Sequence, residues 1–363
     1  MKSAALVSLA AVGFTMSSCA SAAGGPGSGR PAASQKAFPS ATPTPGGSPG
    51  KSASVGQTVN GILVLLPPVP NYLPADVQLS VPSSDVLWVL LENQYLYRST
   101  DRGTSWQQHP MPPGNYPHPE ISFVDDHSGW MATGGVPETQ CNGAGTSVWH
   151  TSDAGTSWQL VASVTEGAPA FRQCKQGLSF IDTTHGFLAA SDPNSPPTIY
   201  RTADGGQTWA GSTLPDPPGF ATQSGGFVLH AGLVRAFGST LVIPAAGMQM
   251  GAQAEVEYVF RSVDGGASWS YLVTVGSGPV GVTFVTLSRW LKLSNDGTGM
   301  ETTDGGKTWH AYPNGYQSAA GVASTFVFGD PLVGYGTVRG GISRTVDGGR
   351  HWTSIKTPGV YAP

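Results

Sequence analysis

Short apolar runs rich in Val, Ile and Phe recur along most of the chain, and polar turns separate them. In three places the same order of residues returns: an apolar run, a turn, and then a Gly–aromatic pair. The runs are 121–123, 178–181 and 325–328, and the pairs that follow them begin at Gly129, Gly186 and Gly334. Short runs of this composition, bounded by turn residues, are typical of β-strands. The pattern therefore predicts antiparallel strand pairs that repeat along the chain.

A longer repeat surrounds these pairs. The octet Ser/Thr-x-Asp-x-Gly-x-x-Trp occurs six times, and its Trp residues lie 40 to 60 residues apart, the longest interval being the one before the fourth repeat's Trp. Repeats of this length, each with room for four short strands, are typical of propeller blades. The octets contain the pairs Asp101 and Trp106, Asp153 and Trp158, Asp204 and Trp209, Asp264 and Trp269, Asp304 and Trp309, and Asp347 and Trp352.

We therefore predict an all-β fold, a β-propeller of four-stranded antiparallel blades with the octet in the turn between the third and fourth strands. Asp followed by Gly favours a tight turn, since the carboxylate accepts backbone N–H bonds and Gly tolerates positive φ. The Trp then packs in the core. Six blades are favoured, with an insertion in the fourth and residues 61–66 as an edge or closing strand. A seventh blade would have to use residues 59–66 and would lack an octet.

The N-terminus has the features of an export signal, which we place at residues 1–18. Lys2 precedes the apolar run 4–14, which is too short to span a bilayer. Residues 16–19 resemble a bacterial lipobox, and this predicts a lipid on Cys19. The alternative is cleavage after small residues at 20–22, which would give a secreted protein. Both alternatives place the mature chain outside the cytoplasm.

Residues 19–57 consist mostly of Gly, Ala, Ser, Pro and Thr, so we expect a disordered tether followed by a propeller domain at 58–363. Charged residues make up only 11% of the chain, the net charge is −4, and there is no block of basic residues. This composition argues against a nucleic-acid partner. We expect a monomer whose membrane contact is made through the lipid alone.

Export also predicts a disulfide between Cys141 and Cys174, because the compartment outside the cytoplasm is oxidising. Chain direction alternates within a blade, so the loop that holds Cys141 and the interblade connection that holds Cys174 fall on one face. That face is opposite the octet turns. The pair is therefore within plausible reach of a disulfide.

The octets resemble the Asp-box (BNR) repeat. Together with the flanking Phe-x-Asp and Gly-Trp positions, they look most similar to the photosystem II assembly and stability factor family, with resemblance also to BNR-repeat bacterial lipoproteins and, more distantly, to sialidases. The resemblance covers residues 77–355. It implies a binding or assembly scaffold that holds a protein, peptide or glycan through its loop face.

The enzymatic alternative is a glycan hydrolase of the sialidase type. The sialidase resemblance would require a Tyr–Glu nucleophile pair, an Asp acid/base and three Arg around the substrate carboxylate. Most arginines here occupy repeated blade positions or the tether; those outside are Arg172, Arg235, Arg289 and Arg339. The sequence therefore predicts a non-catalytic protein, with no cofactor and no metal site.

Loop residues are the remaining candidates for function, because a rigid scaffold presents function on its loops. Six residues are expected on the loop face: Tyr116, Phe171, Arg172, Phe220, Tyr316 and Arg339. His109, His118 and Glu120 also lie near one another in the sequence. We interpret them as members of a solvated loop rather than as metal ligands.

Overall fold

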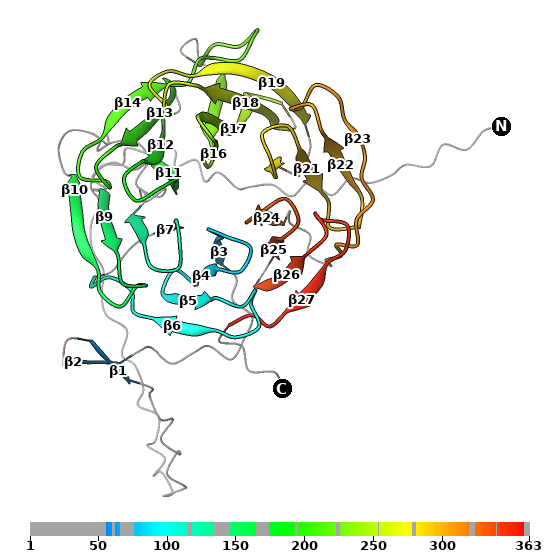
Figure 1. Ribbon diagram of the computed structural model, residues 1–363. Coiled ribbons are helices and arrows are strands. Elements are labelled where there is room, and N and C mark those ends of the chain that lie inside the picture. The colour runs from blue at the N-terminus through cyan, green and yellow to red at the C-terminus, as the bar shows by residue number, and fades with distance from the viewer. Residues whose placement is uncertain are drawn as a thin grey trace, which may run out of the picture. The chain divides into compact units, whose positions relative to one another are not determined.

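A computed structural model describes the fold as six β-sheets arranged as the blades of a propeller around a central axis (Figure 1). Residues of all six blades line a cavity along this axis, which we call the channel. The described residues are 56–59, 62–65, 76–114, 118–133, 146–164, 174–192, 195–222, 226–252, 254–277, 281–318, 324–338 and 340–358. They contain no α-helix, and no helix in this part of the chain has the length and apolar character needed to cross a membrane. The predicted all-β, six-bladed fold is confirmed.

Each blade is an antiparallel sheet of consecutive strands, from the inner strand at the channel to the outer strand at the rim. Blades 1 to 3 are β3 (Val77–Ser80), β4 (Leu87–Leu91), β5 (Tyr95–Ser99) and β6 (Gln107–His109); β7 (Pro119–Phe123), β8 (Gly129–Thr133), β9 (Thr146–Thr151) and β10 (Gln159–Val164); and β11 (Cys174–Phe180), β12 (Gly186–Asp192), β13 (Ser195–Thr202) and β14 (Ala210–Thr213).

The other three blades follow the same order, with one irregularity in blade 4. They are β15 (Phe227–Ala231), β16 (Arg235–Phe237), β17 (Thr240–Gln249), β18 (Val256–Ser262) and β19 (Ser270–Ser277); β20 (Thr283–Phe284), β21 (Trp290–Leu293), β22 (Gly299–Thr302) and β23 (His310–Ala311); and β24 (Thr325–Phe328), β25 (Gly334–Val338), β26 (Gly341–Thr345) and β27 (Thr353–Ile355). In blade 4 the inner strand is split into β15 and β16, which both pair with β17.

The sequence predicts an edge or closing strand at 61–66, but the described residues 62–65 do not pair with a blade. Strand β2 (Ile62–Leu65) pairs with β1 (Gly56–Val59) in a two-stranded sheet of its own. The apolar run therefore forms a strand, as predicted, but its hydrogen-bonding partner is the segment just before it.

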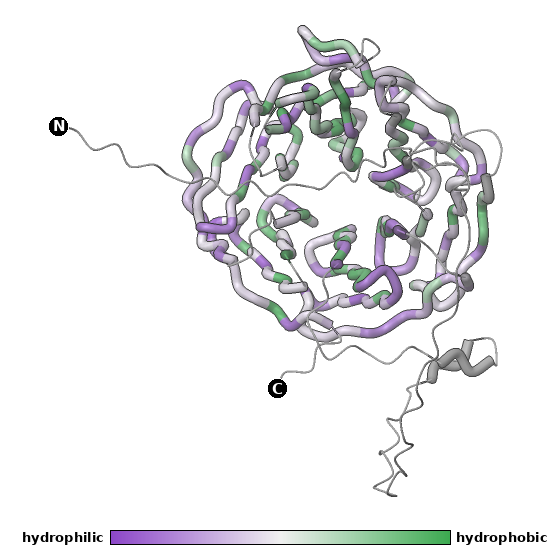
Figure 2. Tube along the Cα trace, turned by 180° about the vertical axis from the view of Figure 1, so that it is seen from behind, coloured by the Kyte–Doolittle hydropathy of each residue, from purple (hydrophilic) through white to green (hydrophobic). Residues whose placement is uncertain are grey.

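The Gly–aromatic pairs are explained by how the inner strand packs on the second strand. Phe123 and Gly129 are register partners, and a Cβ added to Gly129 would lie 2.1 Å from the Phe123 ring. Gly186 under Phe180 and Gly334 under Phe328 repeat the arrangement. Gly is required at these positions because an aromatic ring occupies the space of its side chain. Hydrophobic positions gather on the inner and middle strands (Figure 2).

The Asp-box turn lies between the third and fourth strands of each blade, as predicted, and the first box shows its bonding. Asp101 accepts hydrogen bonds from the Ser105 amide (2.8 Å) and hydroxyl (2.6 Å). The Ser99 hydroxyl donates to Asp101 and accepts from the Gly103 amide, where φ is +80°. The residue directly before the Trp therefore takes part in the hydrogen bonding of the box turn. In the last box His351 takes this place and bonds to Asp347.

The box turns share one face of the ring with the turns between the first and second strands. In blade 2 the Ala154 amide donates to the His127 carbonyl, and in blade 3 the Gly205 amide donates to the Thr184 carbonyl, both at 2.9 Å. The opposite face holds the starts of the inner strands. A ligand that approaches from that side meets the mouth of the channel.

The ring closes between blade 6 and blade 1 without exchange of a strand. The Trp106 indole donates to the Lys356 carbonyl (3.0 Å), Arg344 donates to the Arg102 carbonyl (2.8 Å), and the Tyr335 hydroxyl donates to the Ser84 carbonyl (3.1 Å). The seam is therefore closed by side chains that reach backbone carbonyls.

Candidate functional site

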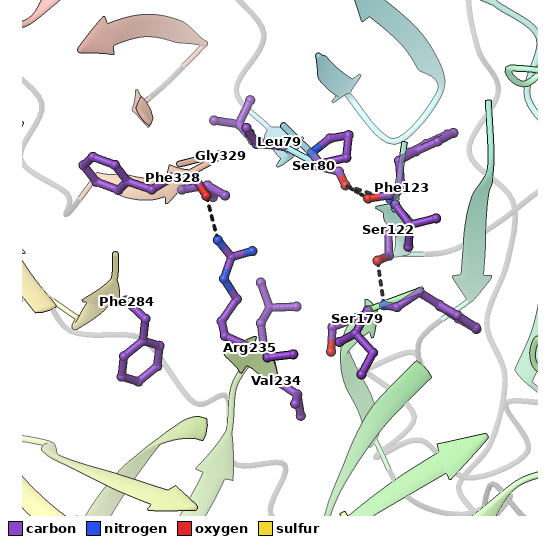
Figure 3. A pocket seen from close by; sticks show the side chains of 18 of the residues that line it. Leu79, Ser80, Ser122, Phe123, Ser179, Val234, Arg235, Phe284, Phe328 and Gly329 are labelled. Atoms are coloured by element: carbon purple, nitrogen blue, oxygen red, sulfur yellow. Dashed lines mark hydrogen bonds between the residues drawn. The ribbon is translucent and has the colours of Figure 1, made fainter. Parts of the chain in front are cut away.

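The inner strands of neighbouring blades are joined by serine hydroxyls. The Ser80 Oγ accepts from the Phe123 amide and the Ser122 Oγ accepts from the Phe180 amide, both at 2.8 Å (Figure 3). This bonding holds the strands around a central chamber of about 300 Å³, which residues from all six blades line.

The chamber differs at blade 4, where the split inner strand brings Arg235 into its wall. The Arg235 guanidinium donates to the Phe328 carbonyl of blade 6 at 2.9 Å. Burial in the chamber wall lowers the pKa of Arg235. Ser179, on the adjacent blade 3, occupies the position of Ser80 and Ser122, but its buried hydroxyl has no hydrogen-bond partner. Figure 3 shows Arg235 and Ser179 in the wall of the same chamber.

A larger cavity of about 570 Å³ forms the mouth of the channel, on the face opposite the Asp-box turns. Its polar lining residues lie near the starts of inner strands or on blade 4: Gln78, Glu120, Gln176, His230, Glu257 and Thr325. The mouth and the chamber share an aliphatic collar, which we define as Leu79, Ile121, Leu178, Leu233 and Val327. The two spaces are therefore continuous, with polar groups above the collar and Arg235 below it.

Two carboxyl groups face this mouth, and both also bind the backbone of the next blade. Glu120 accepts from the Leu178 amide at 2.7 Å, and Glu257 accepts from the Val282 amide at 2.9 Å. Burial raises the pKa of Glu120 and the pKa of Glu257. Desolvation favours the protonated form of each, in which a carboxyl group can donate a hydrogen bond or a proton.

Of the six predicted ligand-face residues, Tyr316 lies in the hydrophobic core, and Phe220 is half-buried and packs against the core. Tyr316 is 2% exposed, its hydroxyl bonds to Ser324, and its ring packs edge-on against Phe326. Phe220 stacks on Phe227, with ring centroids 4.5 Å apart. Both predictions are corrected for the same reason: the connections that carry these rings fold back over the blades, and an aromatic ring there gains more from burial than from exposure.

The other predicted site residues fall where the structure gives no side-chain description. Tyr116, Phe171, Arg172, Arg339, Cys19 and Cys141 lie outside the described residues. Cys174 is the first residue of β11, and only its backbone is described. The lipid on Cys19 and the disulfide therefore stay predictions.

The interpretation of His109 and Glu120 as members of a solvated loop is wrong. His109 ends β6, is 4% exposed, and lies against the Trp88 ring at 5.2 Å. Glu120 belongs to β7 and lines the mouth. In the described residues one group, Asp125, Asp126 and His127, has the spacing of metal ligands, but the Asp125 carboxylate accepts the His127 and Ser128 amides and shapes a turn.

The sequence analysis missed Arg235, Ser179 and Glu257 as members of a site. A signal was present for one of them, because a Ser directly before Phe recurs at Ser122 and Ser179 in two inner strands. No signal marked the split in the inner strand of blade 4, which turns Arg235 toward the channel.

Comparison with known proteins supports the repeat family. The model for the DUF6242 beta propeller domain matches residues 71–232, and the model for the BNR/Asp-box repeat matches residues 300–311. The resemblance to Asp-box repeat propellers is therefore confirmed.

The chain is also similar to a xyloglucanase of Paenibacillus sp, with 25% identity over 266 residues, which is 61% of this chain. It spans only 24% of that enzyme's length. A structure of YCF48 bound to a D1 peptide has 16% identity and a TM-score of 0.40, and covers 77% of this chain and 99% of its own. The GH93 α-L-arabinofuranosidase of Fusarium graminearum has 13% identity and a TM-score of 0.49, and covers 81% and 96%.

The similarity to a xyloglucanase over 61% of the chain overturns the prediction that the chain is not an enzyme. The distribution of the arginines along the chain argues only against the sialidase mechanism. Glycoside hydrolases in general need a pair of carboxyl groups, and Glu120 and Glu257 line one cavity here.

Proposed function

We propose that this chain is an extracytoplasmic propeller, anchored through a lipid on Cys19, that binds an extended peptide segment of a partner at the mouth of its channel. The observation that carries the proposal is the continuous mouth and chamber, where polar groups surround an aliphatic collar. Pockets with mostly apolar walls and a few convergent polar groups are the usual form of a ligand site.

The lining favours a peptide over a glycan. Aliphatic residues such as Val77, Leu79, Ala245 and Val327 make up much of the mouth, and its described lining residues include no Phe, Tyr or Trp. Aliphatic walls suit the side chains of a peptide, while the Gln and Glu groups suit its amides. The export signal, the lipobox and the tether would place this mouth at a membrane surface, within reach of exposed segments of membrane proteins.

Selection of displayed peptides on the full mature chain tests the proposal, with a variant that blocks the mouth. Leu233 is 44% exposed and lines both the mouth and the chamber, so Leu233→Arg should abolish binding of the selected peptides. Val263 is 67% exposed in an Asp-box on the opposite face, so Val263→Arg is the matched control. Equal binding by both variants would exclude the mouth as the site.

A second candidate function is the hydrolysis of a glycan at the same mouth. Its specific support is the pair of carboxyl groups of raised pKa, Glu120 and Glu257, together with the similarity to a xyloglucanase. Incubation with xyloglucan and measurement of released reducing ends tests it. Turnover that is lost in both Glu120→Gln and Glu257→Gln would support hydrolysis, and turnover that both variants retain would exclude these residues.

A further inference from the structure

Arg235 is an arginine in the channel wall for which the described residues supply no counter-ion. Its one hydrogen bond goes to the Phe328 carbonyl, and no described carboxylate lies within 4.0 Å of its guanidinium. A guanidinium has five N–H donors in a fixed fork, so most donors of Arg235 have no partner among the residues that the structure describes. From this cavity and this cation we infer that the chamber is an anion site, which takes a carboxylate group of a ligand on Arg235.

Another partly enclosed arginine, Arg289, has the counter-ion that Arg235 lacks. Arg289, in blade 5, bonds to the Glu301 carboxylate at 2.6 Å and to the Gly348 carbonyl at 2.8 Å. Charge taken out of water is costly unless it is paired. A site that holds a cation without a partner is therefore ready to gain energy from an anion.

The acidic residue among the described residues of the chamber does not fill this role. Asp330 accepts the Leu332 and Val333 amides, both at 2.7 Å, and so shapes the turn after β24. Its carboxylate forms no ion pair with Arg235.

Ser179 is a second, independent indication of a missing partner at the same place. Its hydroxyl has no hydrogen-bond partner, whereas the hydroxyls of Ser80 and Ser122 accept amides of the neighbouring blade. A hydroxyl can turn about its Cα–Cβ bond to suit a ligand. Among the described residues of this chamber, Arg235 thus lacks a counter-ion and the Ser179 hydroxyl lacks a hydrogen-bond partner.

The chamber fits a carboxylate better than a phosphate. One arginine supplies one positive charge in a planar fork, which matches the charge and geometry of a single carboxylate. The ligand must also pass the aliphatic collar, so a slender apolar group next to the carboxylate suits the path. Two sources share this chemistry: a small aliphatic acid, and the C-terminal carboxylate of a peptide. The second source rests on the proposed function.

Calorimetry on the full mature chain tests the site with 4-methylpentanoate as the probe, and with its primary amide and inorganic phosphate as comparisons. We expect binding of the carboxylate, little binding of the amide, and weaker binding of phosphate. Arg235→Gln should weaken carboxylate binding roughly ten- to a hundredfold, the loss expected for a charged hydrogen bond. Arg261 is exposed, so Arg261→Gln is the matched control and should bind as the original chain does.

Three outcomes would overturn the inference: equal affinity for acid and amide, tighter binding of phosphate than of the carboxylate, or a folded Arg235→Gln chain with unchanged affinity. The comparison of acid with amide uses the unaltered chain, so it decides the matter even if the variant does not fold. Peptides selected at the mouth separate this inference from the proposed function. If these peptides bind equally well with an amidated C-terminus, the peptide carboxylate is excluded as the ligand of Arg235, and peptide binding at the mouth is supported. If only the small acid binds, the anion site in the chamber is supported and the proposed peptide binding is contradicted.

Discussion

The phenyl ring of Phe123 lies flat on the indole of Trp88, with ring centroids 3.7 Å apart and planes 7° from parallel. The two residues belong to different blades, and Trp130 and Phe180 repeat the contact between blades 2 and 3 at 3.7 Å. Trp88 and Trp130 are fully buried. Neighbouring blades are therefore held together by stacked aromatic rings as well as by the Asp-boxes.

Replacement of Trp88 by Ala should destabilise the chain by about 3–5 kcal/mol, the range for removal of a buried large aromatic side chain. Denaturant unfolding followed by circular dichroism measures the change. Trp106 is only partly buried, so Trp106→Ala should cost less. A larger loss for Trp106→Ala would contradict the importance of the stacked pair.

Gly129→Ala should destabilise the chain by about 1–3 kcal/mol, because the new methyl group would overlap the Phe123 ring. Combination with Phe123→Leu should recover part of this loss, since the smaller side chain makes room, and a double-mutant cycle measures the coupling. At Gly341 the nearest atom to an added Cβ is 3.5 Å away. Gly341→Ala is the control, and an equal cost there would refute the steric explanation.

Asp204→Ala should lower the melting temperature and leave ligand binding unchanged. The Asp204 carboxylate accepts the Thr208 amide and hydroxyl and the Thr202 hydroxyl, and loss of such bonds costs about 1–2 kcal/mol. The box lies on the face opposite the mouth. Calorimetry with the same peptides or acids checks both properties, Val263→Ala serves as the exposed control, and lost binding at unchanged melting would mean that the box belongs to the site.

Stability should decline between about pH 6.5 and pH 4 because of His109. Burial lowers the pKa of His109 to about 4, so the unfolded chain takes up a proton in this range that the folded chain resists. His109→Leu should flatten the dependence of the unfolding free energy on pH there. His230 is exposed, so His230→Gln should keep the original slope; an unchanged slope in His109→Leu would assign the pH dependence to other groups.

Cys19→Ala should release the chain from membranes into the medium. One thioether-linked diacylglycerol supplies two acyl chains, which is enough for stable anchoring. Incorporation of labelled palmitate into the original chain, and its loss in the variant, checks the expectation. An original chain found unlabelled in the medium would favour the secreted alternative.

The six octets were enough to predict the blade count, the strand order and the place of each box turn, because the repeat ties a turn motif to a fixed position in every blade. The individual side chains of the connections could not be predicted this way. Tyr316 and Phe220 occur in connecting segments, and whether such a ring faces water or core depends on contacts distant in the sequence. The sequence marks Arg235 only as an arginine outside the repeated positions. Its place in the channel depends on the split of the inner strand of blade 4.

The closure of the ring between blades 6 and 1 has a consequence for how the chain can be rearranged. Each blade is one contiguous segment, and side-chain contacts bridge the seam: hydrogen bonds such as those of Trp106 and Arg344, and apolar packing between blades 1 and 6. A circular permutant with new ends in the connection between blades 3 and 4, and a linker across the seam, should therefore keep every blade intact. Under mechanical tension applied at the two ends of the propeller, the seam should part first, and the blades should then peel off one at a time.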